Sequence, residues 1–419
     1  MSEMKQEMSK ARLASLERAA QLDKSAQETN AGVANAKSYD EAEYKKTVAD
    51  RKKIIMEHFG ASESDWNNHI WQMQNRIDNV EKLNAIFKLN QDRYDEIAEA
   101  GENFRWSTTP YYLSLMDVNN RADEIGLLAI PTRHEMSAAS NIDTTLDPMS
   151  EEFTNPAGSI TRRYPDRLII NVTSTCAMLC RHCQRRRNFG SEDHHTSAAD
   201  IEASIEYVRN TPYIRDVLVT GGDPFVLSDD KLEYIISSLR SIPHVEYIRI
   251  GTRTSATMPQ RVTEDFVNML KKYHPIYVNF HFNHPKELTE DAVEACNRLA
   301  NAGVPLGNQM VLLKGINNNK HVVMSLNRKM LMARVRPYYI FHPKSVAGTL
   351  HFCCDIEDGL QIMDHLTGNT SGMAKPYYIY NASGGLGKVP LLRSNFKKIA
   401  EGKYEITTWE GNVVDFQYP

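Results

Sequence analysis

Three cysteines within eight residues constrain this chain of 419 residues more than any other feature. Cys176, Cys180 and Cys183 follow the pattern Cys-x3-Cys-x2-Cys, shortly after the apolar run Leu168–Val172. Closely spaced thiolates are ligands for an iron–sulfur cluster or another soft metal. A structural zinc site needs a fourth ligand nearby, and none follows. The pattern predicts a four-iron cluster with one iron open to another ligand; three reduced thiols without metal are the alternative.

The composition is that of an ordinary globular protein, with 41% hydrophobic and 24% charged residues and a net charge of −4. This balance provides no basic surface for nucleic acid or an anionic membrane. No apolar run reaches the roughly 20 residues that span a bilayer, and the first residues lack the apolar core of a signal peptide. Six cysteines in this length do not predict a disulfide scaffold. We therefore expect a cytoplasmic protein without nucleic-acid or membrane partners.

The amino-terminal part is predicted to be helical. Residues 1 to about 60 are rich in Ala, Glu, Lys and Gln, which is typical of helices with a polar surface. Ser64 is predicted to cap a helix that runs through Trp66 to Ile77, because apolar residues recur there at three- and four-residue spacing. Helices and loops up to about Ser150 are expected to cover a larger domain.

From Arg167 onward, short β-branched runs alternate with helical segments that begin at Ser or Thr caps. The predicted strands are Leu168–Val172, Val217–Val219, Tyr247–Ile250, Ile276–Phe280, Val304–Leu313 and Val335–Phe341. Repeated strand–helix alternation predicts an α/β fold with a parallel sheet and right-handed crossovers. A partial or full barrel is the expected closure, although periodicity alone does not distinguish it from an open doubly wound sheet.

A smaller end piece follows the predicted barrel. It contains a predicted helix at Ile356–Leu366, a strand at Tyr377–Tyr380, a glycine-rich loop at 381–388 and short alternating runs near the end. The predicted regions are an N-terminal helical region at 1–150, the barrel at 151–350 and a C-terminal segment with β-structure at 351–419.

Polar residues follow the predicted strands. Gly221-Gly222-Asp223 follows the second strand, His281 the fourth and Lys344 the sixth, while Gln309 lies within the fifth. Because barrel active sites are built at the carboxyl ends of strands, this placement predicts a catalytic face.

Two further motifs carry charge. Arg185, Arg186 and Arg187 follow the last cysteine of the motif and could bind a carboxylate or phosphate, or form a solvated basic turn. The run Ser383-Gly-Gly-Leu-Gly-Lys388 does not have the spacing of a phosphate-binding P-loop. A lysine on a glycine-rich loop suits a Schiff base with pyridoxal phosphate (PLP), with loop amides near the phosphate.

Together these motifs resemble the lysine 2,3-aminomutase family of radical S-adenosylmethionine (SAM) enzymes. The resemblance runs from about Trp66 to Lys388, and its further segments are 161–167, 243–253, 279–285, 303–309 and 336–339. It implies a partial (β/α)6 radical SAM barrel with a helical N-terminal extension. It also implies an isomerase that moves the α-amino group of an amino acid to the β-carbon, with a [4Fe–4S] cluster, SAM and PLP as cofactors.

The resemblance implies roles for individual residues. By position, Cys176, Cys180 and Cys183 hold the cluster. The implied SAM contacts are Gly221, Gly222, Asp223, His281 and Gln309. Lys388 resembles the catalytic lysine that binds PLP covalently, and the implied PLP pocket contains Arg163, Tyr164 and Arg167. Arg185 resembles the arginine that binds the α-carboxylate of the substrate.

Two departures from the family pattern concern the substrate. Lysine-specific members bind the side-chain ammonium with two aspartates, at positions held here by Lys344 and Asn381. The local formal charge therefore changes from −2 to +1. Since a unit charge pair about 4 Å apart is worth roughly 4 kcal/mol at a dielectric near 20, the pocket should repel an ammonium and attract a carboxylate. This predicts glutamate as the substrate and Lys344 and Asn381 as substrate-binding residues.

Two alternatives remain at this point. Lys344 could face solvent while Asp355 or Asp358 binds an ammonium, which would leave lysine as the substrate. The chain could also be a non-catalytic iron–sulfur redox or sensor protein.

Other expectations concern metals and partners. The chain ends at Pro419 without the cysteine-rich zinc segment of many lysine-specific members, so we expect no zinc. Cys296 is predicted to be a buried residue that packs in the core, and Cys353 and Cys354 are predicted to be plain thiols. The resemblance implies a one-electron donor such as flavodoxin or ferredoxin, and we expect a homo-oligomer that acts on a small amino acid.

Overall fold

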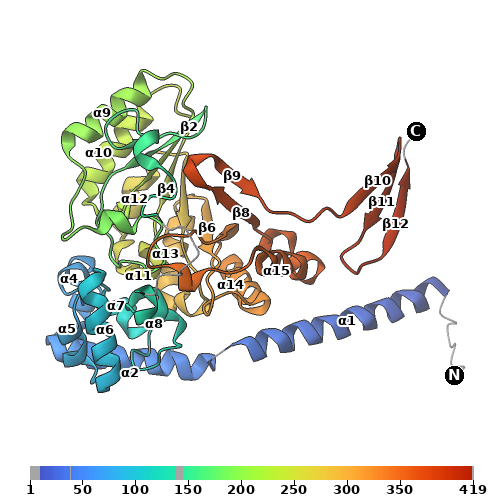
Figure 1. The fold of residues 1–419 in the computed structure, drawn as a ribbon, viewed down its shortest axis with the longest axis horizontal. Helices are drawn as coiled ribbons and strands as arrows, with labels where there is room; N and C mark the ends of the chain where they lie inside the picture. Colours follow the sequence, from blue (N-terminus) through green and yellow to red (C-terminus); the bar gives the residue numbers. More distant parts are fainter. Residues whose placement is uncertain (1–9, 38, 137–144, 418–419) are drawn as a thin grey trace, which may run out of the picture.

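The computed structural model describes residues 10–37, 39–136 and 145–417, and Figure 1 shows their arrangement. The helices are α1 (Lys10–Ala36), α2 (Glu41–Phe59), α3 (Glu63–Trp66), α4 (His69–Gln74), α5 (Val80–Ile86), α6 (Gln91–Asn103), α7 (Pro110–Ser114), α8 (Glu124–Ala129), α9 (Ala198–Arg209), α10 (Asp229–Arg240), α11 (Thr254–Thr257), α12 (Glu264–Lys271), α13 (Glu290–Asn301), α14 (Lys320–Met332) and α15 (Ile356–Asn369). The strands are β1 (Ile160–Thr161), β2 (Arg167–Asn171), β3 (Asp216–Thr220), β4 (Tyr247–Gly251), β5 (Ile276–Phe280), β6 (Leu306–Val311), β7 (Arg336–Phe341), β8 (Tyr377–Ala382), β9 (Gly387–Pro390), β10 (Phe396–Ala400), β11 (Lys403–Thr407) and β12 (Val413–Gln417).

The main sheet has nine strands that lie side by side in chain order, from β1 to β9. Strands β2 to β8 are parallel, and β1 and β9 pair antiparallel at the two edges. The sheet curls into a half-barrel with helices packed against it (Figure 1). The predicted partial α/β barrel is thus confirmed. The doubly wound alternative is wrong, because a doubly wound sheet reverses its strand order at a switch point.

Alternation along each strand divides the sheet into two faces. Ile170, Val219, Ile250 and Val278 are fully buried within one large apolar cluster that includes residues of the surrounding helices. Their neighbours in sequence point the opposite way, and Ile169 is one of those that line a cavity inside the half-barrel. Helices therefore cover one face of the sheet, and side chains on the other face line the cavity.

The predicted helix from Ser64 to Ile77 is wrong. The chain instead forms two short helices, α3 and α4, whose caps are Ser62 and Asn68. The Asn68 side chain accepts a hydrogen bond from the backbone of Ile70. Asparagine side chains compete with helical hydrogen bonds in this way, which explains why the helix stops and starts again.

Two predicted boundaries also change. The predicted strand Val304–Leu313 is shorter, and β6 begins after Pro305, which has no backbone N–H to donate to a sheet. Lys388 was expected on a loop, but it lies on the edge strand β9, where it pairs with Asn381 of β8. A strand fixes the direction of the Lys388 side chain more firmly than a glycine-rich loop would.

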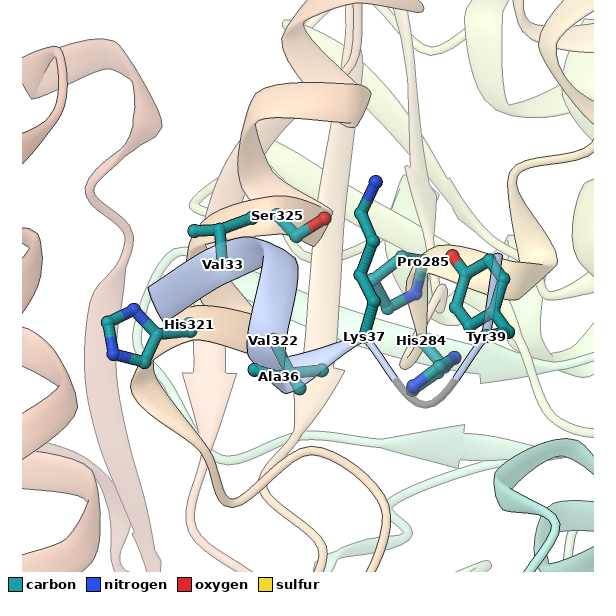
Figure 2. Close-up of a pocket in the computed structure, with 9 residues that line it drawn as sticks. All are labelled: Val33, Ala36, Lys37, Tyr39, His284, Pro285, His321, Val322 and Ser325. Atoms are coloured by element: carbon teal, nitrogen blue, oxygen red, sulfur yellow. The ribbon is translucent and has the colours of Figure 1, made fainter. Parts of the chain in front are cut away.

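Helix α1 and the small sheet of β10 to β12 extend from the half-barrel on the same side (Figure 1). Arg18 of α1 forms an ion pair with Glu410, next to that sheet, at 2.9 Å. The strands β10 to β12 confirm the predicted β-rich end piece, and α1 and α2 confirm the predicted N-terminal helices. Positions 1–9 lie outside the described residues. A cavity of about 10 Å³, about the space of one water molecule, lies where the end of α1 meets α14. Figure 2 shows the residues that line it.

The loop that carries the three cysteines rests on the N-terminal region. Arg181 is fully buried, and its Nε and Nη2 donate to the carboxylate of Glu135 at 2.9 and 2.6 Å. Arg186 also donates to Glu135, at 2.5 Å. Two buried guanidinium groups thus share one buried carboxylate, which holds the middle of the cysteine loop and the segment that follows it.

We predict that Glu135→Gln destabilises the protein by about 3–5 kcal/mol, because it leaves two buried arginines without a counter-charge. Denaturant unfolding followed by circular dichroism measures this loss. Glu202→Gln, at an exposed position of α9, is the matched control. A loss for Glu135→Gln no larger than that of the control would contradict the prediction.

Candidate active site

A cavity of about 280 Å³ lies inside the half-barrel at the carboxyl ends of its strands. Most of the residues singled out in the sequence line it: Arg163, Cys176, Cys180, Cys183, Arg185, Gly221, Gly222, Asp223, His281, Gln309, Lys344, Asn381 and Lys388. Tyr164 and Arg167 are not on its wall: Tyr164 contacts Lys388, and Arg167 stacks on Tyr164. Positions from 163 to 388 are therefore brought together at one site.

The three cysteines of the motif lie on the cavity wall. Burial raises the pKa of the Cys176 and Cys183 thiols and raises that of Cys180 to about 11. Bound iron would stabilise the thiolates against this burial. Among the described residues, no three His, Cys, Asp or Glu side chains are grouped closely enough to hold a single metal ion. A four-iron cluster does not require such convergence, because each cysteine binds a different iron, so the donor set fits a cluster.

Gly221 and Gly222 allow two loops to pack closely. Gly221 has φ of +128°, and the N–H of Gly222 donates to the carbonyl of Thr173 at 2.5 Å. A Cβ on Gly222 would lie 2.3 Å from the carbonyl oxygen of Thr175. The glycines were expected to admit a ligand; their immediate neighbour is the backbone that leads into the cysteine loop.

Asp223 and His281 lie on the same wall of the cavity. Asp223 accepts from the Thr252 hydroxyl and from the Arg253 backbone, each at 2.7 Å. Burial and then the charge of Arg253 lower the pKa of His281 to about 4, so its imidazole is uncharged at neutral pH. Together with the Gln309 amide, it offers hydrogen bonds to a polar ligand such as SAM.

Lys388 is held by Tyr164 and by aromatic rings. Its backbone N–H donates to the Tyr164 hydroxyl at 2.9 Å, and Arg167 stacks on the ring of Tyr164 at 3.8 Å. The Lys388 amine lies 5.3 Å from the ring centre of Tyr339 and 5.9 Å from that of Phe341. The amine is therefore fixed on the inner face of the half-barrel.

The surroundings of Lys388 suit covalent binding of a phosphorylated aldehyde. Burial, then the charges of Arg249 and Arg167, lower the pKa of Lys388 to about 8, which raises the fraction of neutral, nucleophilic amine. Arg163 lines the same cavity, and its buried Nε has no hydrogen-bond partner among the described residues. A buried guanidinium with an unused donor fits an anion, so these residues are compatible with PLP.

Lys344 lies in the cavity and not in solvent. Its ammonium donates to Oε1 of Gln184 at 2.5 Å. Burial, then the charges of Arg163 and Arg185, lower the pKa of Lys344 to about 7. The alternative that involved Asp355 and Asp358 is wrong, because both cap the N-terminus of α15 and neither lines the cavity.

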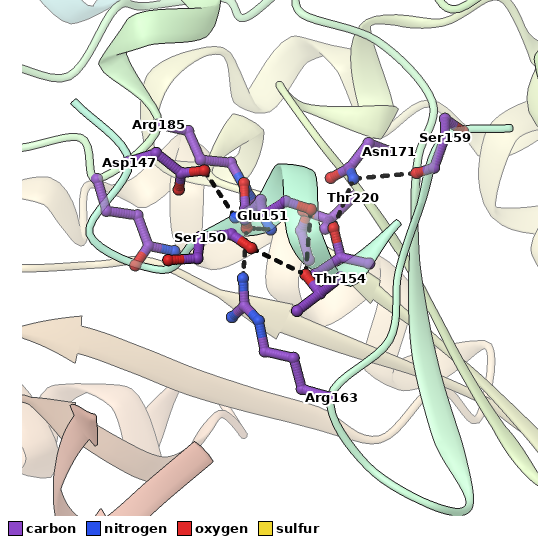
Figure 3. Close-up of polar contacts among 12 residues, drawn as sticks. Asp147, Ser150, Glu151, Thr154, Ser159, Arg163, Asn171, Arg185 and Thr220 are labelled. Carbon is purple, nitrogen blue, oxygen red and sulfur yellow. Dashed lines mark hydrogen bonds and ion pairs between the residues drawn. The ribbon is translucent and has the colours of Figure 1, made fainter. Parts of the chain in front are cut away.

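Sequence analysis missed Glu151. Its carboxylate forms ion pairs with Arg163 at 3.0 Å, Arg185 at 2.9 Å and Arg187 at 2.6 Å, and Figure 3 shows Arg163 and Arg185 pointing toward it. Burial opposes its ionisation, but the three arginines outweigh this and hold the pKa of Glu151 well below its ordinary value. The only signal in the sequence was the run Arg185–Arg187, because clustered arginines that are buried need a carboxylate as counter-charge.

Glu151 also orients Arg185. The ion pair uses Nε and Nη2 of Arg185 and not Nη1, so one edge of the guanidinium is held while the other end remains for a ligand. The residue therefore fixes the direction of the arginine that the sequence predicts to bind a carboxylate.

Comparisons with known proteins agree with this geometry. Residues 170–325 match the model of the Radical SAM superfamily. The chain is 55% identical over 375 residues to glutamate 2,3-aminomutase of Clostridioides difficile (strain 630), covering 90% of this chain and 88% of that one. It is 44% identical over 359 residues to L-lysine 2,3-aminomutase of Clostridium subterminale, covering 85% and 86%. The chain belongs to the radical SAM aminomutases.

Membership of this family makes the chain an isomerase and not a redox or sensor protein. Its cofactors are a [4Fe–4S] cluster, SAM and PLP. None of the helices in the described part of the chain is both long and apolar enough to cross a membrane.

We predict that Glu151→Gln lowers kcat/KM for the amino-acid substrate by about tenfold or more. The change removes the charge that orients Arg185, and a hydrogen bond between charged groups is worth about 1.5–3 kcal/mol. Steady-state kinetics of the reconstituted enzyme measure the loss, and iron content shows whether the cluster still assembles. An unchanged kcat/KM at normal iron content would contradict the prediction.

Proposed function

We propose that the chain is a glutamate 2,3-aminomutase, which converts L-glutamate to β-glutamate. The observation that carries this proposal is the position of Lys344 in the cavity, where lysine-specific relatives are expected to have an aspartate. An ammonium there attracts the side-chain carboxylate of glutamate and repels the side-chain ammonium of lysine. The identity of 55% to a relative named glutamate 2,3-aminomutase, against 44% to one named for lysine, supports the same substrate.

The proposed roles follow the sequence predictions. Cys176, Cys180 and Cys183 would hold the cluster, and Lys388 would bind PLP. Arg163, Tyr164 and Arg167 would form the PLP pocket, and the SAM contacts would be Gly221, Gly222, Asp223, His281 and Gln309. Arg185 would bind the α-carboxylate of the substrate, while Lys344 and Asn381 would bind its side-chain carboxylate.

When bound, the cluster, SAM and PLP supply the radical chemistry that moves the amino group. The chain's own task is to position the substrate and exclude water. Arg185, held by Glu151, would fix one carboxylate, and Lys344 would fix the other. With both ends of glutamate held, the atoms C2 and C3 between them are restrained relative to Lys388.

Several further features are part of the proposal. Radical chemistry requires a one-electron donor, for which a flavodoxin or ferredoxin is suitable. We also propose a homo-oligomer, a cytoplasmic location and the three regions 1–150, 151–350 and 351–419 as structural units.

We predict that the reconstituted enzyme converts L-glutamate but not L-lysine to the β-isomer. The test is anaerobic incubation with reductant, SAM, PLP and either amino acid, followed by chromatography of the products. Conversion of lysine but not glutamate would overturn the proposed substrate.

A charge-reversal variant provides the control. Lys344→Asp with Asn381→Asp changes the local formal charge by −3 and should abolish glutamate turnover while the cluster still forms. Retained turnover would show that these two residues do not select the substrate.

We predict that kcat/KM for glutamate falls as pH rises above about 7. Burial and the charges of Arg163 and Arg185 lower the pKa of Lys344 to about 7, so the ammonium that binds the carboxylate is lost above that pH. Because kcat/KM reports groups of the free enzyme, the pH profile should show this pKa. Lys344→Arg keeps its charge and should remove the fall; identical profiles for both enzymes would contradict the assignment.

A further inference from the structure

Gln184 lies where two functional loops meet. It directly follows the predicted cluster ligand Cys183 and directly precedes Arg185. Its side chain is half-buried and lines the same cavity as Lys344 and Asn381. The position is therefore inside the predicted substrate pocket, although nothing in the sequence motif marks it.

The backbone on both sides of Gln184 is fixed. The N–H of Cys183 donates to the carbonyl of Cys180 at 3.2 Å, and the N–H of Arg185 donates to Sγ of Cys183 at 3.3 Å. On the facing loop, the N–H of Val346 donates to the carbonyl of Lys344 at 2.9 Å. Two anchored loops thus present the two side chains to each other.

The contact between these side chains decides how the Gln184 amide is oriented. An ammonium only donates hydrogen bonds, so the amide must turn its oxygen toward Lys344. The contact uses the oxygen of Gln184 and one N–H of Lys344. The amide NH₂ and two N–H groups of the ammonium then remain for a ligand in the cavity.

Such an array suits a carboxylate and opposes an ammonium. A carboxylate accepts several hydrogen bonds through its two oxygens, whereas an ammonium needs acceptors, and one of the two lone pairs of the Gln184 oxygen already accepts from Lys344. Arg163 and Arg185, which lower the pKa of Lys344 by their positive charge, add to the preference for an anion.

We propose that Gln184 is a specificity-determining residue whose amide NH₂ donates to the side-chain carboxylate of L-glutamate while its oxygen orients Lys344. This inference rests on the proposed function. It extends the pocket beyond the two positions that distinguish lysine-specific relatives, and it links substrate recognition to the cysteine loop.

Gln184→Glu tests the inference, since it replaces the NH₂ by an oxygen at nearly the same size. The holoenzyme with cluster, SAM and PLP is titrated with L-glutamate by calorimetry without reductant, so that no turnover occurs. We expect the Kd to rise at least about tenfold, because one donor is lost and a negative charge lies beside the incoming carboxylate. Gln361→Glu, exposed on α15, is the matched control and should bind as the wild type does.

A second variant and a second measurement separate recognition from folding. Gln184→Met removes both polar atoms without adding charge and should raise the Kd less than Gln184→Glu. Iron content is measured in both variants, because the cluster ligand Cys183 directly precedes this position, and a wild-type value shows that the cysteine loop still folds. Under turnover, KM should rise more than kcat falls.

The outcomes distinguish the two proposals. Equal Kd values for the wild type and Gln184→Glu would overturn the role of Gln184 alone. Binding without any turnover of glutamate by the wild type would overturn the proposed function alone. Absence of glutamate binding by the wild type would overturn both.

Discussion

Glu135 is the charge on which the cysteine loop depends. It lies between Arg181 and Arg186, and all three side chains are at most 5% exposed. Two buried cations and one buried anion are stable only while every member keeps its partner. Arg181 also donates to the carbonyl of Arg105, and its backbone N–H donates to that of Leu128. The N-terminal region therefore packs against the barrel and also fixes the position of the cysteine loop through these hydrogen bonds.

The same principle governs the substrate side of the cavity. Arg163, Arg185 and Arg187 surround the carboxylate of Glu151, and Asp147 also pairs with Arg187 at 3.3 Å, so three cations face two anions even before Lys344 is counted. Such an excess is costly without an anion. The proposed substrate, with two carboxylates, and the phosphate of PLP would both relieve it. The same arginine charges thus affect both the stability of the protein and its preference for anionic ligands.

Sequence reasoning predicted those parts that follow from local rules. The parallel sheet followed from strand–helix alternation, and the family resemblance implied its closure as a partial barrel. The caps Ser197, Ser228, Thr263 and Thr289 lie where helices begin. The cavity followed from polar residues at strand ends. The break between α3 and α4 was missed because apolar residues recur at helical spacing across it. The Asn68 side chain nevertheless accepts a backbone hydrogen bond and starts a new helix. Glu151 and Gln184 were missed because their partners are distant or unmarked in sequence, and only the fold brings them together.

The pairing of β8 with β9 has a consequence for how this enzyme can change. Because Lys388 pairs with Asn381, the lysine proposed to bind PLP and a residue proposed to bind substrate are tied by strand register. A slip of one residue would turn Lys388 to the outer face of the sheet. An insertion or deletion of a single residue in the turn at Ser383–Gly385 would therefore disconnect the lysine from its cavity. The turn also needs its glycines, because Gly384 and Gly385 have φ of +69° and +75°. The hairpin thus restricts its own length, because only one register keeps Lys388 beside Asn381 at the cavity.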